Sequence, residues 1–268
     1  MNHPETDSII ETAHAVADAA RAAILPHFRT RGGISADSKE KDRFDPVTIA
    51  DRAAETAMRA VLAERRPQDG ILGEELGRTD GTSGLTWVLD PIDGTRGFLS
   101  GTPTWGVLIA VGDAQGPRFG IIDQPYIGER FWGGYGTSGM TGPTGSHPMG
   151  TREARPLDDC ILFSTFPEVG SCHERAGFNA VAERVRLVRY GTDCYAYALL
   201  AAGQIDLVIE AGLYAYDVQA PIAVIEAAGG IVTDWQGRPA PNGGRILAAA
   251  NAQVHAAALD FLKAMPLD

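Results

Sequence analysis

Residues 87–98 read WVLDPIDGTRGF: an apolar run, a proline, and a turn that holds two aspartates. The run WVL predicts a β-strand that ends at Asp90, because a proline follows and cannot donate to a strand ladder. Asp93 and Gly94 then form a turn. Two carboxylates therefore converge at one strand end, and the Ile92 carbonyl between them adds another oxygen. Hard cations such as Mg²⁺ prefer oxygen ligands of this kind.

The residues after the turn favour an anion. Gly94 and Thr95 are expected to present backbone N–H groups at the start of a helix or turn, where a phosphate could bind. The alternative is an ordinary surface turn, since Asp-Pro and Asp-Gly are common turn dipeptides. This stretch by itself leaves both interpretations open.

Three further acidic segments stand where predicted elements begin or end. Asp51 lies in DPVTIAD, and Asp217 follows AGLYAY. Glu74 and Glu75 follow the apolar run ILG. Functional groups are often displayed at such positions. Each acid also has a structural alternative: a helix cap for Asp51 and Asp217, and a solvated turn for the two glutamates.

The pattern outside these segments predicts an α/β protein. Apolar spacings of three and four predict helices over residues 8–28 and 47–65, the second after an Asp-Pro start signal. Short β-branched runs from residue 85 onward predict strands. Residues 134–156, rich in Gly, Ser, Thr and Pro, predict a hairpin or connecting loop, and strands alternate with helices after it. We therefore expect a change of lobe near residue 150.

Composition excludes several classes of protein. The chain has 268 residues, 44% hydrophobic and 21% charged, as ordinary globular proteins do. Its formal net charge of −11 argues against nucleic acid as the main partner. The sequence contains neither a signal-peptide pattern nor a run of roughly 20 apolar residues, which disfavours secretion and membrane insertion. Cys160, Cys172 and Cys194 are widely spaced, so we expect no disulfide framework and a cytoplasmic location.

Two weak motifs are set aside. Gly134, Gly136 and Gly139 satisfy G-x-G-x-x-G, but the segment that follows has no helical pattern, so a dinucleotide site is not expected. The six histidines form no H-x-H or H-x-x-x-H pair, and a histidine-based zinc site therefore has no support.

Taken together, DPVTIAD, LGEE, DPIDGTRGF and YDVQAPIAVIEAAGG resemble the four signature segments of the inositol monophosphatase superfamily, in the same order and at comparable separations. The resemblance implies a layered αβαβα sandwich, a homodimer, and a Mg²⁺-dependent phosphatase with two or three ions per site. An N-terminal lobe (1–150) would carry most metal ligands, and a C-terminal lobe (151–268) would carry the last ligand and the specificity residues. The implied metal ligands are Glu74, Asp90, the Ile92 carbonyl, Asp93 and Asp217.

The resemblance also implies catalytic roles. Thr95, paired with Asp51, would orient the attacking water and help to deprotonate it, and Glu75 would support the metal cluster from outside. Asp93, Gly94 and Thr95 would contact the substrate phosphate. Either Lys39 or Lys41 would stand in for a basic residue that the family has near the metals; the spacing leaves that choice open. Bound metals neutralise the phosphate and lower the pKa of a water molecule, which fits this slow reaction.

The C-terminal half indicates the substrate. Residues 189–217, RYGTDCYAYALLAAGQIDLVIEAGLYAYD, and residues 101–106, GTPTWG, resemble the histidinol-phosphatase branch of the superfamily. In this interpretation Asp193 pairs with a cationic group of the substrate. Glu210 makes a second polar contact, to the same amine or, in the alternative, to a sugar or inositol hydroxyl. The structural alternatives are a turn or helix-cap acid for Asp193 and a solvated strand end for Glu210.

Three functional classes follow. The leading one is hydrolysis of the small-molecule phosphate monoester L-histidinol phosphate. The second is an inositol-1-phosphate phosphatase or a 3′(2′),5′-bisphosphate nucleotidase of the same superfamily. The third, a non-catalytic phosphate-ligand binding protein, is remote, because a degenerate protein is expected to lose part of the acidic set, and the whole set is present here.

Overall fold

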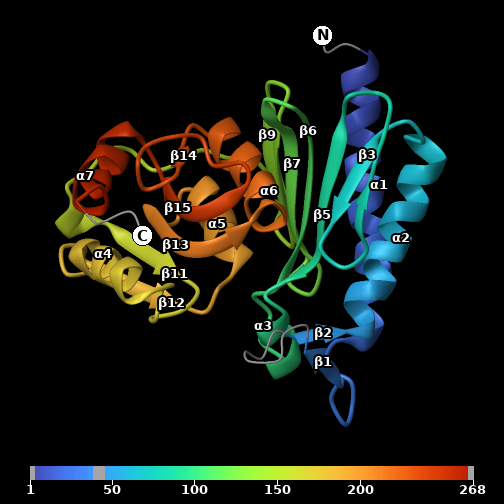
Figure 1. Ribbon diagram of the computed structural model, residues 1–268, viewed down its shortest axis with the longest axis horizontal. Helices are drawn as coiled ribbons and strands as arrows, with labels where there is room; N and C mark the ends of the chain where they lie inside the picture. Colours follow the sequence, from blue (N-terminus) through green and yellow to red (C-terminus); the bar gives the residue numbers. More distant parts are fainter. Residues whose placement is uncertain (1–3, 39–45, 265–268) are drawn as a thin grey trace.

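The computed structural model describes residues 4–38 and 46–264. Its helices lie on both faces of two main β-sheets (Figure 1). They are α1 (Pro4–Ile24), α2 (Ile49–Arg65), α3 (Thr95–Ser100), α4 (Cys172–Ala182), α5 (Cys194–Ala201), α6 (Ala215–Ala227) and α7 (Ala252–Leu262). Two short 3₁₀ helices cover Leu25–His27 and Leu157–Asp159.

The first main sheet has eight strands in the order β10-β9-β8-β7-β6-β5-β3-β4. Its pairings are antiparallel except that of β3 with β5, which is parallel. The strands are β3 (Gly70–Gly73), β4 (Gly77–Thr79), β5 (Thr86–Asp93), β6 (Gly106–Asp113), β7 (Gly116–Gln124), β8 (Glu129–Gly134), β9 (Thr137–Gly142) and β10 (Gly145–His147).

The second main sheet has five strands in the order β12-β11-β13-β15-β14. Strand β11 runs parallel to β12 and β13, whereas β15 is antiparallel to β13 and β14. The strands are β11 (Ile161–Ser164), β12 (Leu187–Tyr190), β13 (Leu207–Tyr214), β14 (Ile231–Thr233) and β15 (Gly243–Ala249). A separate small sheet pairs β1 (Ala36–Ser38) with β2 (Pro46–Thr48).

The elements stack in five layers (Figure 1). Helices α1 and α2 cover the outer face of the eight-stranded sheet, α5 and α6 lie between the two sheets, and α4 and α7 cover the outer face of the five-stranded sheet. The α/β sandwich predicted from the sequence is confirmed. The described residues contain no helix that is both long and apolar enough to cross a membrane.

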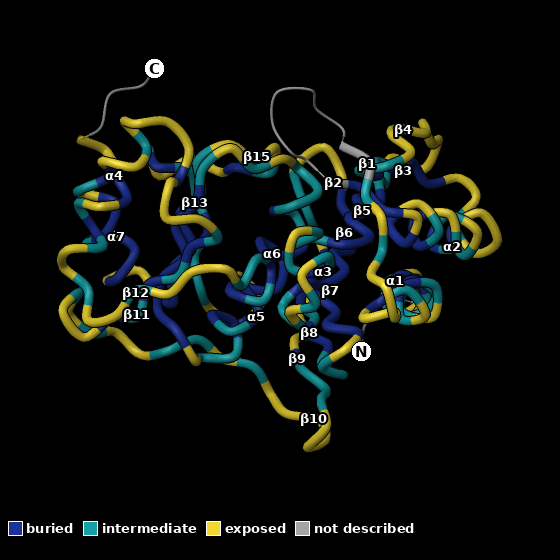
Figure 2. Tube along the Cα trace, turned by 90° about the horizontal axis from the view of Figure 1, so that it is seen from below, coloured by how far each residue is buried: buried dark blue, intermediate teal, exposed yellow. Residues whose placement is uncertain are grey.

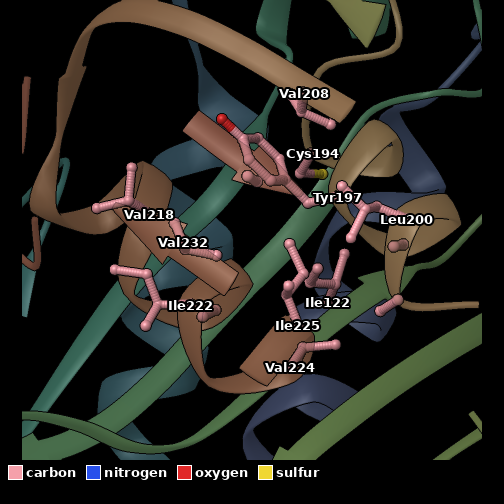
Figure 3. Packing of buried hydrophobic residues seen from close by; sticks show 14 of the residues in the cluster. Ile122, Cys194, Tyr197, Leu200, Val208, Val218, Ile222, Val224, Ile225 and Val232 are labelled. Atoms are coloured by element: carbon pink, nitrogen blue, oxygen red, sulfur yellow. The ribbon is translucent and has the colours of Figure 1, made fainter. Parts of the chain in front are cut away.

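Much of helices α5 and α6 and of strands β5 and β6 is buried (Figure 2). Helix α6 is apolar nearly all round because it packs against both sheets. Figure 3 shows Ile225 of α6 beside Ile122 of β7, whereas Val208 of β13 lies apart from both, near Tyr197 of α5. This shared core holds the N-terminal end of α6 near the end of β5.

Local boundaries differ from the sequence prediction in four places. Strand β5 does not end at Asp90 but continues through Pro91 to Asp93, with a break in its pairing with β6 between the two aspartates. Helix α1 begins and ends four residues early, with a 3₁₀ turn after it. Helix α2 begins at Ile49 rather than at residue 47, because Pro46–Thr48 pairs with Ala36–Ser38 as a strand. The predicted hairpin or loop at 134–156 contains the strands β9 and β10, and its glycine motif forms the β8–β9 hairpin.

Candidate active site

A cleft of about 670 Å³ lies between the end of the eight-stranded sheet and the five-stranded sheet, beside the starts of α5 and α6. Its lining comes from the end of β5 and the start of α3, the segment after β11, the start of α5, β13 and the start of α6. A cleft of this size fits a small-molecule ligand. Most residues that the sequence singled out line it: Glu74, Asp90, Ile92, Asp93, Gly94, Thr95, Asp193, Glu210 and Asp217.

Three carboxylates form its floor. Asp90 and Asp93 end β5, and Asp217 lies in the first turn of α6. Their oxygens lie within 4.8 Å of one another. A bulge in the pairing of β5 with β6 falls between Asp90 and Asp93, at the Asp-Pro-Ile-Asp segment. The packing of α6 against β5 thus brings together acids that are far apart in sequence.

Glu74 and the Ile92 carbonyl adjoin this cluster. The Glu74 amide donates to the Leu89 carbonyl at 3.1 Å, which continues the parallel pairing of β3 with β5. A hydrogen bond between the side chains of Glu74 and Asp90 contributes to the raised pKa of Asp90. The Ile92 carbonyl accepts the Thr95 hydroxyl at 3.1 Å. The oxygens available here are the hard ligands that Mg²⁺ prefers.

The charges of the cluster are poorly compensated. Burial, followed by the charges of Glu74, Asp93 and Asp217, raises the pKa of Asp90 well above its usual range. Burial and the neighbouring Asp217 raise the pKa of Asp93 to about 8. Within the described residues, neither Asp90 nor Asp93 forms an ion pair with Arg, Lys or His. The residues present therefore fit a bound cation, which would replace the missing positive charge.

The Asp51 carboxylate is hydrogen-bonded to Thr48. Its Oδ2 accepts from the Thr48 amide at 2.8 Å and from the Thr48 hydroxyl at 2.5 Å, as the third residue of a capping box on α2. Thr95 donates instead to Ile92. The described residues thus show no direct Asp51–Thr95 hydrogen bond, and the predicted joint action of the two residues on a water molecule stays a prediction. Asp51 Oδ1 is buried with no partner in that same set, and nearby Glu74 helps to raise the pKa of Asp51, after burial.

Glu75 lies apart from the residues that line the cleft. The side chain of Glu75 is half-buried outside the set that lines the cleft, and its backbone amide donates to Glu55 at 2.7 Å. Its predicted supporting role stays a prediction. Lys39 and Lys41 lie outside the described residues.

Asp193 stands at the N-cap of α5 but does not cap it. Its backbone has φ 46° and ψ −138°, a region that residues with a side chain rarely adopt. The side chain makes no capping hydrogen bond within the described chain. It lies over Gly94, where an added Cβ would come within 2.9 Å of the Asp193 carboxyl carbon. Burial, with the charges of Asp93 and Glu210, raises the pKa of Asp193 to about 8.

Glu210 is buried in the cleft wall rather than solvated at a strand end. It is 5% exposed. One of its carboxylate oxygens accepts from the Thr165 amide at 2.8 Å and from the Thr165 hydroxyl, and the other accepts from Tyr197 at 2.8 Å. Burial raises the pKa of Glu210. The carboxylate is therefore held rigidly, and any contact to a ligand would use its remaining lone pairs.

The sequence did not assign the aromatic part of the cleft. Tyr214 stacks on Tyr216 with ring centroids 5.3 Å apart, and the Arg96 guanidinium lies 4.8 Å from the centre of the Phe166 ring. All four line the cleft. No feature of the sequence marked Arg96 or the aromatic residues as members of this cluster. Their position in the cleft depends on how distant parts of the chain pack together, which the local sequence does not reveal.

Known proteins resemble this chain over nearly its whole length. The model of the Inositol monophosphatase family matches residues 5–264. The bifunctional phosphatase IMPL2 of Arabidopsis thaliana, a chloroplastic protein, is 37% identical over 98% of this chain and 77% of its own. A histidinol-phosphatase of Streptomyces coelicolor is 32% identical over 94% of this chain and 96% of its own. The structure of an inositol monophosphatase from Zymomonas mobilis superposes with a TM-score of 0.84 at 38% identity, covering 98% of this chain and all of that one (100%).

Proposed function

Because the chain belongs to the inositol monophosphatase family of metal-dependent phosphatases, and is thus a phosphoric monoester hydrolase, we propose that it hydrolyses L-histidinol phosphate with Mg²⁺. The histidinol-phosphatase of Streptomyces coelicolor supports this substrate, as does the position of Asp193. The reaction would yield L-histidinol and phosphate, a step in histidine biosynthesis.

The metal site of the proposal uses the acids of the cleft floor. Mg²⁺ bound there, as two or three ions, would neutralise the phosphate and lower the pKa of a water molecule. Its proposed ligands are Glu74, Asp90, the Ile92 carbonyl, Asp93 and Asp217. These carboxylates lie at the ends of buried elements, so their positions are fixed before a cation binds. This arrangement limits the reorganisation that metal binding requires.

The chain's own groups bind and orient the phosphate in this proposal. The first turn of α3 has backbone N–H groups without partners inside the helix, and Gly94 and Thr95 stand at its start. The Thr95 hydroxyl is held by the Ile92 carbonyl, at the edge of the cluster. We propose that Thr95 orients the attacking water there. Asp51, which is held by Thr48, would act on that water through an intervening group rather than by contacting Thr95 directly.

Asp193 is the observation that carries the choice of substrate. Histidinol phosphate has an ammonium group on the carbon next to the esterified CH₂, so a phosphate bound at Gly94 leaves the ammonium close by. The Asp193 carboxyl lies over Gly94 and is turned away from the helix that it precedes. A buried carboxylate with a raised pKa gains most from a cationic partner. We propose that Asp193 binds this ammonium and that Glu210 contributes a second polar contact.

The acidic side chains of the cleft wall disfavour the other two phosphate esters. A nucleoside bisphosphate brings a second phosphate, which would face Glu168, Asp193 and Glu210 in the cleft. Inositol 1-phosphate has no ammonium group to pair with Asp193, although its hydroxyls could contact Glu210. Inositol 1-phosphate is the second candidate, and it is favoured by the similarity to the inositol monophosphatase of Zymomonas mobilis.

The test is a comparison of kcat/KM for L-histidinol phosphate, inositol 1-phosphate and adenosine 3′,5′-bisphosphate, with Mg²⁺, on wild type and Asp193→Asn. We expect wild type to prefer histidinol phosphate. Asp193→Asn should lower kcat/KM for that ester by about 10- to 100-fold, the usual effect of removing a hydrogen bond to a charged group. The loss for inositol 1-phosphate should be much smaller.

The matched control is Asp158→Asn, which makes the same change of charge at an exposed position outside the cleft. It should leave all three values of kcat/KM near those of wild type. Equal losses for the amine and inositol esters in Asp193→Asn would contradict the assignment of Asp193. A wild-type preference for inositol 1-phosphate would contradict the proposed substrate and keep the phosphatase.

The proposal also covers the division into lobes, the oligomeric state and the cellular location. We propose that the lobe of residues 1–150 supplies most metal ligands, and that the lobe of residues 151–268 supplies Asp217 and the specificity residues. We also propose a homodimer, as the family resemblance implies, which light scattering on the purified protein would test. The proposed location is the cytoplasm; the three free cysteines, two of them buried, are consistent with a reducing compartment.

A further inference from the structure

Glu55 is a buried carboxylate behind the metal cluster. It lies on α2, is fully buried, and does not line the cleft. Its Oε2 accepts from the Glu75 amide at 2.7 Å, and both of its oxygens accept from the Leu76 amide, at 3.2 and 3.3 Å. Its Oε1 also accepts from Arg59 Nε at 2.7 Å. The carboxylate therefore satisfies two successive backbone donors of the turn between β3 and β4.

Gly73 permits this approach. A Cβ at Gly73 would lie 1.9 Å from Glu55 Oε1, so a residue with a side chain would displace the carboxylate. Arg59 extends the contact along the hairpin, because it also donates to the Gly77 carbonyl and, at 3.0 Å, to the Thr79 hydroxyl. Glu55 and Arg59 thus hold both ends of the turn against α2.

Glu74 lies between the two residues, Gly73 and Glu75, that the Glu55 carboxylate contacts. On one side is Gly73, against which the Glu55 carboxylate packs, and on the other is Glu75, whose amide the same carboxylate binds. The Glu74 amide donates to the Leu89 carbonyl, so the Glu74 backbone is held beside β5 directly after the end of β3. The direction of the Glu74 side chain toward Asp90 therefore depends on the turn that Glu55 stabilises.

We propose that Glu55, with Arg59, is a positioning residue for metal binding: it fixes the turn that directs Glu74 into the cation site. The inference rests on the proposed metal-dependent function and goes beyond it, because Glu55 touches neither metal nor substrate. Residues that orient a metal ligand from outside change metal affinity by about 10- to 100-fold when they are replaced. Glu55→Gln should have such an effect, because an amide NH₂ would face the backbone N–H donors.

The experiment measures Mg²⁺ binding by calorimetry on metal-free full-length protein, without substrate. Glu55→Gln should raise the Kd for Mg²⁺ by about 10- to 100-fold. At saturating Mg²⁺ its kcat should return to within a few-fold of wild type, because the reacting groups are unchanged. Hydrogen exchange of the Glu75 and Leu76 amides in the metal-free protein should become faster than in wild type.

Asp206→Asn is the matched control for loss of a buried carboxylate. Asp206 is fully buried in the other half of the molecule, where it accepts from the Ile161 amide at 2.8 Å and pairs with Arg152 and Arg155. This variant should lower the Tm as Glu55→Gln does and leave the Kd for Mg²⁺ unchanged. If Glu55→Gln lowers the Tm and its Kd stays within twofold of wild type, the positioning role is overturned.

A milder variant covers the case in which Glu55→Gln does not fold. Arg59→Lys keeps the positive charge but cannot donate to Glu55, Gly77 and Thr79 together. It should raise the Kd for Mg²⁺ about threefold, and an unchanged Kd would overturn the inference. Wild-type protein separates the two claims: if it binds no Mg²⁺, the proposed function fails and the inference fails with it, whereas wild-type binding with unchanged variants overturns the inference alone.

Discussion

Asp123 on β7 and Asp90 on β5 are both buried aspartates of the eight-stranded sheet, but their neighbours differ in charge. Asp123 faces the outer helix α1. Its carboxylate forms an ion pair with Arg21 of α1 at 2.7 Å and with Arg130 of β8 at 2.6 Å. Asp90 faces the central layer, where Glu74, Asp93 and Asp217 raise its pKa further after burial.

The difference separates a structural charge from a functional one. A buried carboxylate paired with two arginines is neutralised by the chain itself, and removing the carboxylate leaves both arginines without their common partner. A buried group of acids that repel one another costs stability, and such a cost is typical of sites that bind a cation. We therefore expect the two sites to respond in opposite ways to the same change, aspartate to asparagine.

Asp93→Asn should have the largest effect on activity. It should lower kcat/KM by at least about 10³-fold, or about 4 kcal/mol of barrier, because a metal ligand is lost. Thermal unfolding of the metal-free protein should change little or shift upward, since the substitution removes repulsion with Asp217. Steady-state kinetics and calorimetry check the two parts. Near-normal activity would contradict the assignment of the metal site.

Asp123→Asn should show the reverse pattern. It leaves Arg21 and Arg130 buried or half-buried without their common carboxylate, which typically destabilises a protein by about 3 kcal/mol. Denaturant unfolding measures this loss. The value of kcat/KM per folded molecule should stay within about twofold of wild type. A large loss of activity with unchanged stability would remove the distinction between the two sites.

Mg²⁺ should stabilise the fold through one site and not the other. A ligand at 100 times its Kd stabilises a protein by about 2.7 kcal/mol per site. Thermal scans with Mg²⁺ and with a chelator should therefore show a higher Tm with the metal for wild type and for Asp123→Asn. The shift should be largely absent for Asp93→Asn. Equal shifts in all three proteins would place Mg²⁺ binding elsewhere.

The smallest expected effect concerns His14, beside the arginine pair. Its pKa is lowered by burial and by Arg130, against smaller opposite effects of Asp18 and Asp123. The folded state thus binds fewer protons than the unfolded state as pH falls below about 6.5, so folding stability decreases there. His14→Gln should make the free energy of unfolding less sensitive to pH between 5 and 7. Unfolding curves at several pH values check this, and an unchanged slope would contradict it.

The local parts of the site could be predicted from the sequence. The Asp-Pro-Ile-Asp segment marks a strand end by itself, and the structure has β5 ending there. Asp217 needed the family resemblance, because nothing local indicates that the start of α6 lies against β5. The α/β sandwich followed from alternating helix and strand patterns, which report burial directly.

Other features have no local signal. The capping contact of Asp51 with Thr48 at the start of α2 was not foreseen, and the joint role of Asp51 and Thr95 stays a prediction. Asp193 has a positive φ, and an aspartate after Gly-Thr does not by itself predict one. Glu55 could not be recognised in the sequence because a single acid in a helical pattern is usually exposed. Its burial becomes visible only in the structure, where Gly73 packs against its carboxylate.

The most direct test of the central claim is a crystal structure of the wild-type protein with Mn²⁺ in place of Mg²⁺, using anomalous scattering to locate the ions. Mn²⁺ accepts the same oxygen ligands. The account predicts anomalous peaks among the carboxylates of Asp90, Asp93 and Asp217, and none beside Asp123. An empty carboxylate cluster, at a Mn²⁺ concentration that supports phosphate release, would contradict it.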